Sequence, residues 1–279
     1  MTPSRCADLS EAAREPISAT ATNALNWLLV EVRGTWPRDV SDLGGLAQES
    51  RMAITTWLEE TPSSRLLFIR RPGGAREHLA AFVVHASEHE PRVRRFAVSG
   101  ADAFDPAREG EDVSSQLVLV CGHGTRDACC ALRGSAVFGA LREIVPPEHL
   151  WLSSHQGGHR FAANVLVLPV GIQLGRVTPH DAADVVGAAL QGRIALEYYR
   201  GRVAYTDREQ AAERAVRELR GLVRVTDVAL VGDDGTKVAF RDLDGHELVA
   251  VPHEVAGPPV PASCGAEPEP QRHYTARVG

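Results

Sequence analysis

Residues 116–145, QLVLVCGHGTRDACCALRGSAVFGALREIV, decide the fold of this chain. The first five residues form a continuous apolar run, which predicts a buried strand that ends directly at Cys121. Apolar residues recur at helical spacing from Ser135 onward, which predicts a helix over 135–145. The stretch between them contains three cysteines. The segment therefore predicts a strand, a cysteine-bearing loop and a helix.

Three more strands and a helix are expected after this segment. Residues 150–153 form a short apolar run that ends at a loop containing His155, and runs over 165–168 and 172–177 flank a turn at Pro169. Thr178 is expected to be the N-cap of a helix that extends to about Gln191. Periodicity alone supports only the α/β class. Strand, helix, strand, hairpin and helix is the order of a thioredoxin-like domain, which we assign to residues 114–222.

Residues 1–105 predict a smaller α/β domain, which could be a degenerate thioredoxin-like unit. It comprises a strand over 25–32, a helix over 48–60, and strands over 66–70, 79–85 and 94–98. A turn at Pro72-Gly73-Gly74 and a linker over 101–114 are expected. After the capping box Thr206-Asp207-Arg208-Glu209 and its helix, which Gly221 should end, residues 223–255 predict a β-meander. Residues 256–279 are expected to be a Pro-rich tail, and no internal sequence repeat is evident.

Composition excludes several classes of protein. The 279 residues are 44% hydrophobic and 24% charged, which is typical of a globular chain. Thirty Lys and Arg residues against 36 Asp and Glu residues are scattered, so we expect no nucleic-acid partner. The single lysine, Lys237, lies outside any G-x-x-x-x-G-K pattern, which argues against a P-loop. Apolar stretches are too short to span a membrane, and the polar N-terminus predicts no signal peptide, so we expect a cytoplasmic location with reduced thiols.

Two loops carry the residue types that bind soft metal ions. Cys121, Cys129 and Cys130 lie in the first loop, and His155 and His159 lie in the second. Both loops follow strand ends, so their side chains could converge at one edge of the sheet. Thiolates with neutral imidazoles suit zinc, copper or an iron–sulfur cluster. Glycines at four positions could leave room for such a group and offer N–H donors to it, namely Gly122, Gly124, Gly157 and Gly158.

The combined motif resembles the sucrase/ferredoxin-like family, whose members are thioredoxin-like proteins that bind a [2Fe–2S] cluster. The resemblance depends on Cys121-x8-Cys130, on His155-x-Gly-Gly-His159 and on the following Arg160-Phe161-Ala162-Ala163-Asn164, and it covers roughly residues 6 to 200. It implies that Cys121 and Cys130 hold one iron and that His155 and His159 hold the outer one. Cys129 would then be a free thiol beside the cluster. No paired carboxylates support a glycosidase.

The implied ligand set carries a mechanistic expectation. Two ferric ions, two sulfides, two thiolates and two neutral imidazoles sum to zero charge, whereas four thiolates would make the cluster a dianion. The potential should therefore exceed that of a four-cysteine cluster. Histidine-ligated Rieske centres span about -150 to +300 mV, against about -400 mV for plant-type ferredoxins. The second ring nitrogen of each imidazole could also couple the electron to a proton. We therefore expect a one-electron carrier or redox sensor with a redox partner protein.

Residues near the motif have weaker expectations. Arg126 and Arg160 flank the two loops and could donate to cluster sulfur or attract an acidic partner, although solvated side chains are the simpler interpretation. His123 stands outside the family motif and is expected to have a structural role. Cys264 in the tail is expected to be a passive exposed thiol, and Cys6 is a second outlier.

Two other kinds of function stay open at this point. Two cysteines and two histidines also suit a structural zinc ion, although zinc sites usually use cysteines closer together than Cys121 and Cys130. A thiol oxidoreductase built on the cysteines would normally need Cys-x-x-Cys at a helix N-terminus, which the sequence lacks. No residue pattern identifies a substrate pocket, so enzyme activity is open and a carrier is favoured.

Overall fold

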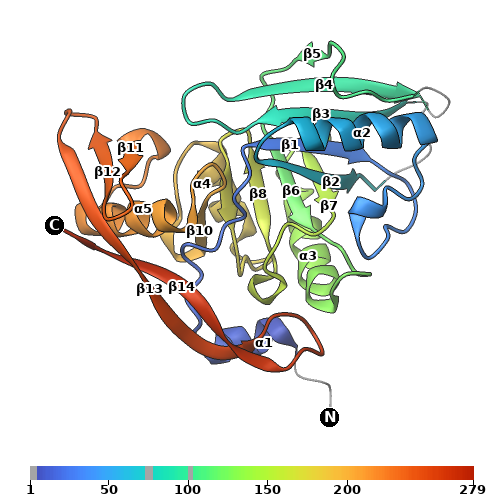
Figure 1. Ribbon diagram of the computed structural model, residues 1–279. Helices are drawn as coiled ribbons and strands as arrows, with labels where there is room; N and C mark the ends of the chain where they lie inside the picture. Colours follow the sequence, from blue (N-terminus) through green and yellow to red (C-terminus); the bar gives the residue numbers. More distant parts are fainter. Residues whose placement is uncertain (1–4, 73–77, 100–102) are drawn as a thin grey trace.

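The computed structural model describes residues 5–72, 78–99 and 103–279, and the described part forms two β-sheets (Figure 1). The larger sheet has the strand order β10-β9-β8-β6-β7-β2-β1-β3-β4-β5. The smaller sheet has the order β11-β12-β13-β14. The predicted turn at Gly73 and Gly74 and the first two residues of the predicted linker lie outside the described residues.

The thioredoxin-like prediction for the second half of the large sheet is confirmed by its strand order. β6 pairs in parallel with β7 and antiparallel with β8, and β8 pairs antiparallel with β9. Helix α3 connects β6 to β7, and α4 follows the β8–β9 hairpin. The bounds are β6 Leu117–Cys121, α3 Ala128–Leu141, β7 Leu150–Ser153, β8 Val165–Leu168, β9 Ile172–Leu174 and α4 Ala182–Leu190, with β10 Tyr199–Arg202 added beside β9.

The first half of the large sheet repeats this arrangement. β1 pairs in parallel with β2 and antiparallel with β3, and β3 pairs antiparallel with β4. The bounds are β1 Asn26–Glu31, α2 Gln48–Glu60, β2 Ser64–Arg70, β3 His78–His85 and β4 Arg92–Ser99. The two halves join where β2 pairs antiparallel with β7. Two units with one strand order therefore share one sheet without a detectable sequence repeat.

The linker prediction is wrong in its second part. Strand β5, Glu111–Asp112, pairs with β4 and extends the large sheet. Phe104 is buried and packs edge-to-face on Phe96, with ring centroids 5.4 Å apart. An apolar side chain in a stretch rich in Pro, Gly and acidic residues thus anchors this segment to the first half of the sheet.

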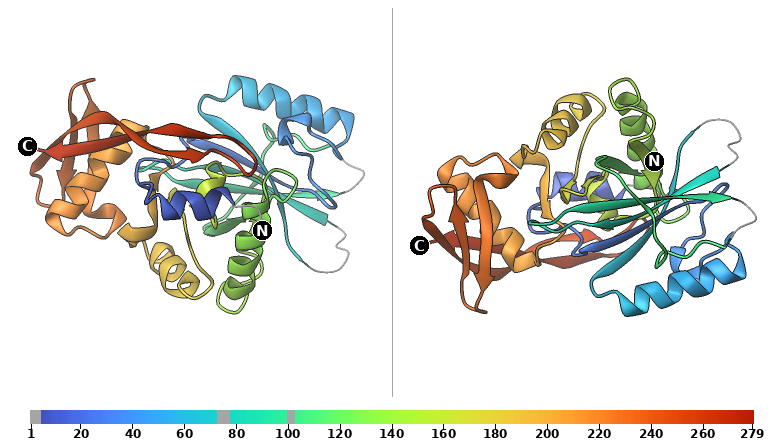
Figure 2. Two further views of the ribbon diagram at one scale, coloured as in Figure 1. Left: turned by 90° about the horizontal axis from the view of Figure 1, so that it is seen from below. Right: turned by 90° about the horizontal axis from the view of Figure 1, so that it is seen from above.

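Alternating side chains of the large sheet face different hydrophobic cores. Val118 and Val120 on β6 pack with α3 and α4, whereas Leu119 faces a core that includes Trp27 on β1 and Trp151 on β7. Helix α2 contributes to a third core on the far side of β1 and β2. Figure 2 shows α2 on one side of the molecule and α3 with α4 on the other. The two halves therefore share a central core and are covered by helices on their outer sides.

The C-terminal region confirms one prediction and overturns another. Thr206 forms both hydrogen bonds of the predicted capping box with Glu209, and Gly221 ends the helix with φ 65°. The predicted meander contains β11, β12 and the start of β13, but residues 256–279 are not an irregular tail. The bounds are α5 Asp207–Arg220, β11 Val228–Asp233, β12 Val238–Asp242, β13 Glu247–Pro261 and β14 Pro268–Val278.

The hairpin formed by β13 and β14 crosses the molecule to the N-terminal helix. Helix α1, Cys6–Ala12, lies beside the far end of this hairpin (Figures 1 and 2). The turn between the two strands carries Cys264, which therefore comes close to Cys6 and to the start of α3. Four short 3₁₀ helices complete the described elements, namely Val40–Asp42, His159–Phe161, Leu196–Tyr198 and Val225–Asp227.

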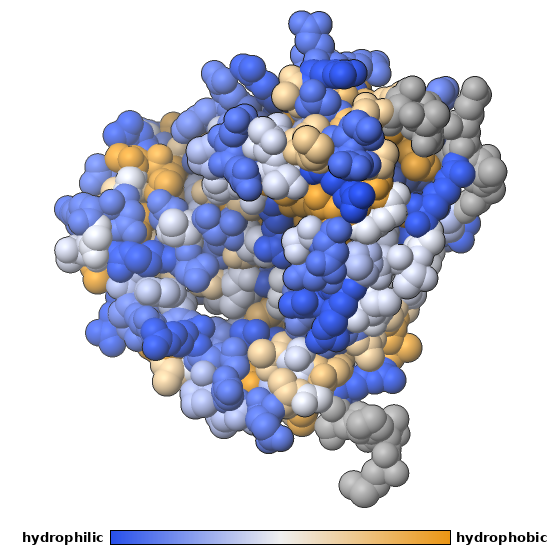
Figure 3. Space-filling model, turned by 45° about the vertical axis from the view of Figure 1, so that its right-hand side comes forward, coloured by the Kyte–Doolittle hydropathy of each residue, from blue (hydrophilic) through white to orange (hydrophobic). Residues whose placement is uncertain are grey.

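One face of the molecule is seen in Figure 3. On this face, hydrophilic residues dominate and hydrophobic residues gather in separate patches. Within the described parts of the chain, every helix is too short or too polar to cross a lipid bilayer.

Candidate metal centre

The two cysteines of the motif come from the β6–α3 unit. Cys121 is the last residue of β6, and Cys130 lies in the first turn of α3. The predicted start of this helix at Ser135 is wrong, because α3 begins at Ala128 with Asp127 as its N-cap, whose carboxylate accepts from the N–H of Cys129 at 2.8 Å. Cys129 and Cys130 are therefore helical residues with side chains in different directions.

The two histidines of the motif come from the β7–β8 loop. His155 follows β7, and His159 begins a 3₁₀ helix. Their rings stack with centroids 4.1 Å apart and an interplanar angle of 21°. Ligand atoms of Cys121, Cys130 and His155 all lie within 4.8 Å of one another, and Nδ1 of His159 is 4.0 Å from Sγ of Cys130. The structure thus brings all four predicted ligands together.

The protonation states suit a metal centre. A hydrogen bond from the thiol of Cys130 lowers the pKa of Cys121 well below its ordinary value, and that same contact raises the pKa of Cys130. Burial, together with the charge of His155, lowers the pKa of His159 to about 4. Its imidazole is therefore neutral at neutral pH, which is the form that binds metal. Nδ1 of His155 is buried without a hydrogen-bond partner, which fits a nitrogen that binds a metal ion.

His123 has the structural role expected of it. Its Nδ1 accepts from the backbone N–H of His155 at 3.1 Å, so its Nε2 carries the proton and donates to the carbonyl of Pro37 at 2.8 Å. Both ring nitrogens are therefore occupied. His123 is not a ligand; it holds the loop that presents His155.

Three of the four glycines are needed for the close packing of the loops. A Cβ at Gly157 would lie 2.5 Å from Thr22 Oγ1, and one at Gly158 would lie 2.7 Å from Arg200 Nη2. A Cβ at Gly122 would lie 2.8 Å from Leu152. The N–H groups of Gly122 and of Gly124 already donate to backbone carbonyls, so the expectation that these two donate to a cluster is wrong.

The two arginines next to the motif have different surroundings. Arg160 has partners of its own, because its Nε donates to Glu15 at 2.7 Å and its guanidinium lies over the ring of Phe161. Burial raises the pKa of Glu15, but contacts with His273, Ser10 and Arg160 lower it by more, so Glu15 is ionised. Arg126 lines a cavity beside His155.

A buried cation that the sequence did not reveal supports the histidine loop. Arg200 on β10 is buried, and its Nη1 donates to the carbonyl of Gly157 at 3.0 Å and to Oδ1 of Asn164 at 2.8 Å. Asn164 in turn donates to the carbonyl of Gly158 at 2.9 Å. Burial lowers the pKa of Arg200 to about 9, so it stays protonated at neutral pH. No motif marks Arg200, since its role depends on β10 lying beside β9.

Residues 17–201 match the sucrase/ferredoxin-like family, which agrees with the motif and the fold. The chain belongs to this family. Similar curated proteins include "Altered inheritance of mitochondria protein 32" of Meyerozyma guilliermondii, 33% identical over 105 residues that make up 34% of this chain and 37% of that protein. The Saccharomyces cerevisiae protein of that name is 32% identical over 109 residues, 34% of this chain and 35% of that protein. The matched region thus spans little more than a third of the length of these curated relatives.

A solved structure also resembles part of the chain. It is a thioredoxin-like [2Fe–2S] ferredoxin from Aquifex aeolicus, 21% identical, covering 32% of this chain and 94% of that chain with a TM-score of 0.28. The thioredoxin-like assignment for this family member rests on the strand order of β6, β7, β8 and β9.

Proposed function

We propose that this chain binds one [2Fe–2S] cluster through Cys121, Cys130, His155 and His159 and serves as a one-electron carrier or redox sensor. The observation that carries the proposal is the convergence of two buried thiols from the β6–α3 unit with two stacked imidazoles from the β7–β8 loop. The neutral state of His159 and the free Nδ1 of His155 fit imidazole ligation. The cluster would supply the redox-active iron, and the chain would set its charge and its access to solvent.

We expect the electron to leave the cluster on the side where His155 lies. His155 is half-buried, whereas the two cysteines are buried and His159 is only 9% exposed. His155 lines a cavity of about 430 Å³ together with Arg65 and Arg126. Because the imidazole of His155 is partly exposed, its second ring nitrogen can exchange a proton with solvent.

The charge around this cavity suits an acidic redox partner protein. Arg38, Arg65 and Arg126 line it with a single carboxylate, Asp39, so cations are in excess. Arg65 also donates to the carbonyl of His155 at 3.1 Å, so one of these cations contacts the loop that carries a proposed ligand.

The five free cysteines fit a compartment that keeps thiols reduced, such as the cytoplasm.

Anaerobic purification with visible spectroscopy and with iron and sulfide analysis tests the proposal. We expect about two irons and two sulfides per chain with red-brown absorption. Both Cys130→Ser and His159→Ala should lose the visible bands, while the exposed His180→Ala should keep them. A colourless protein with zinc bound at Cys121 and Cys130 would refute the cluster and leave a structural zinc module.

The assignment between the adjacent cysteines has its own test. Cys129→Ser should retain the iron and the visible bands, because Cys129 contacts Cys6 and Cys264 and not the four proposed ligands. Loss of iron in Cys129→Ser with retention in Cys130→Ser would move the ligand by one residue. Circular dichroism of each variant separates loss of the cluster from loss of the fold.

A further inference from the structure

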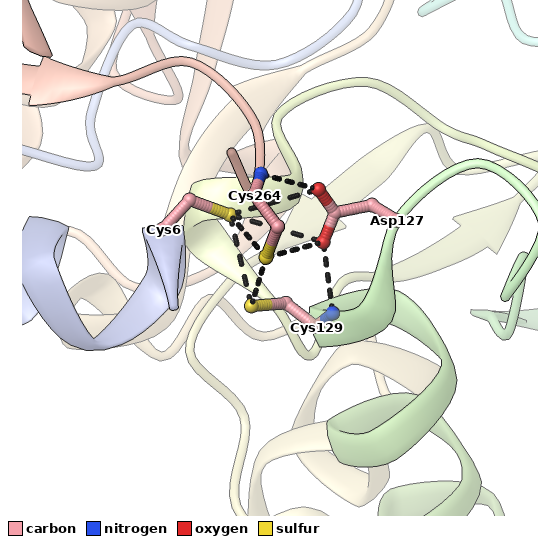
Figure 4. A group of neighbouring side chains, drawn as sticks. All are labelled: Cys6, Asp127, Cys129 and Cys264. Carbon is pink, nitrogen blue, oxygen red and sulfur yellow. Dashed lines mark hydrogen bonds between the residues drawn. The ribbon is translucent and has the colours of Figure 1, made fainter. Parts of the chain in front are cut away.

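Three cysteines outside the proposed cluster site meet one carboxylate at the N-terminus of α3. Cys6 begins α1, Asp127 and Cys129 are the N-cap and first-turn residues of α3, and Cys264 lies in the β13–β14 turn. Their side chains point toward a common centre (Figure 4), and one ligand atom from each lies within 4.8 Å of the others. Three segments distant in the sequence thus supply four soft or anionic donors.

The separations among these donors are those of a tetrahedral metal site. The three sulfur–sulfur distances are 3.6 Å for Cys6 and Cys129, 3.4 Å for Cys129 and Cys264, and 3.6 Å for Cys264 and Cys6. Zinc–sulfur bonds of about 2.3 Å in a regular tetrahedron place two sulfurs about 3.8 Å apart, and a sulfur and a carboxylate oxygen about 3.5 Å apart. The observed sulfur–oxygen distances are 3.3 Å from Cys264 and 3.8 Å from Cys6 to Asp127.

The surroundings hold the carboxylate in place as a ligand. One oxygen of Asp127 accepts from the N–H of Cys129 and the other accepts from the N–H of Cys264, each at 2.8 Å. Burial raises the pKa of this carboxyl, but those two hydrogen bonds, together with the thiol of Cys264 and the charge of His159, lower it by more, so Asp127 is ionised. Metal ligands are usually oriented by such outer hydrogen bonds.

A disulfide explains this group of three cysteines and one carboxylate less well than a metal ion does. Three thiols at nearly equal separations leave one cysteine over after any pairing, and each of the three is a free thiol in the structure. Three thiols and one carboxylate around a common centre also form a complete set of four ligands, whereas a disulfide would use only two of them. Thiolate-rich tetrahedral sites select zinc.

We propose that Cys6, Asp127, Cys129 and Cys264 bind a structural zinc ion, at a site separate from the proposed [2Fe–2S] ligands. The zinc would fix α1 and the tip of the β13–β14 hairpin to the first turn of α3. Because Cys130 is the next residue of that turn, the same ion would hold the helix end that carries a cluster ligand. Thiolates and a carboxylate complete the coordination, so the site has no open position for catalysis.

Metal analysis of the purified full chain and of single variants tests the proposal. We expect about one zinc per chain, together with X-ray absorption that shows three sulfur neighbours and one oxygen neighbour. Cys264→Ser should lose zinc and keep iron, whereas Cys130→Ser should lose iron and keep zinc. Cys264→His supplies another zinc ligand at the exposed turn, so it should retain zinc and thereby distinguish ligation from packing.

Several results would overturn the zinc site without affecting the cluster proposal. These are zinc far below one per chain in the wild-type protein, zinc retained in both Cys6→Ser and Cys264→Ser, an iron ion in place of zinc, or a disulfide among these three cysteines by mass spectrometry under non-reducing conditions. Failure of the cluster proposal would instead appear as wild-type protein without iron and sulfide.

Discussion

Replacement of Gly134 by alanine should separate the two cysteine ligands of the proposed cluster. Gly134 lies on α3 where the helix contacts the end of β6, and a Cβ there would be 1.9 Å from the carbonyl oxygen of Cys121. Real Cβ atoms essentially never come within 3.0 Å of such an atom. Because the obstacle is backbone, α3 must move away from β6 by about 1 Å.

This displacement gives a worked magnitude. Overpacking of this kind costs about 1–3 kcal/mol, and removal of a helical glycine returns about 1 kcal/mol, so Gly134→Ala should lower the free energy of unfolding by up to about 2 kcal/mol. The effect on the cluster should be larger. Metal sites require ligand distances within about 0.2 Å of their ideal values, and Cys121 and Cys130 stand on the two elements that are pushed apart.

Urea denaturation and iron analysis measure both effects, with Gly139→Ala as the matched control. Gly139 is exposed on the same helix, and a Cβ there would meet no atom within 4 Å. Gly139→Ala should therefore raise the free energy of unfolding by up to about 1 kcal/mol and retain full iron content. If Gly134→Ala is stabilised like its control and keeps its iron, the packing argument is refuted.

Three more predictions concern buried charges. Arg200→Leu should lower the free energy of unfolding by about 2–3 kcal/mol, because the carbonyl of Gly157 and other buried acceptors lose a charged donor; an unchanged urea midpoint would contradict this. Glu213→Ala should lower the free energy of unfolding by about 3–5 kcal/mol, because it leaves the fully buried Arg217 without its ion-pair partner. Glu218→Ala removes the partner of Arg214 in a more exposed pair on the same helix and should cost under about 1 kcal/mol. Equal losses of stability in thermal unfolding would argue against the role of burial. The lowered pKa of Glu15 means that its carboxylate stabilises the fold above about pH 4.3, and that this contribution disappears as the pH falls through the lowered pKa. Glu15→Gln should therefore be less stable than wild type at neutral pH, and the difference should shrink in acid. A difference in stability that does not change with pH would contradict the assignment.

Local signals in the sequence predicted most of the elements. Helix α2 has the predicted bounds, and the capping box at Thr206 and the stop at Gly221 both form as expected. The predicted start of α3 is too late although Asp127 is a good N-cap residue, because the adjacent cysteines fit a metal-binding loop as well as a helix. A helix start and a ligand position are compatible, since only one face of the first turn is needed for packing.

The β13–β14 hairpin was missed for a different physical reason. Prolines interrupt the alternation of apolar and polar residues over 252–270, and a strand inside a sheet rarely tolerates them. Beyond Ala256 the hairpin has only two strands, so each strand has one unpaired edge on which a missing N–H costs nothing. The register also shifts between Ala256 and Pro259, which accommodates the prolines at this point of the strand.

The two candidate metal sites differ in how far the sequence could predict them. Cys121, Cys130, His155 and His159 follow neighbouring strand ends, so their convergence could be expected from the topology. Cys264 meets Cys6 across 258 positions of sequence, and the contact depends on the length of an unexpected hairpin. No spacing rule applies to such a pair.

The junction between β2 and β7 has a consequence for any attempt to divide this protein. Each of these strands would be an outer strand of its own half, and pairing at Ile69 with Ser153 and at Arg70 with Leu152 covers both. Unpaired strand edges template association with other chains. Either half prepared alone would expose a hydrogen-bonding edge beside apolar residues, so self-association through that edge is the expected behaviour of the separated pieces.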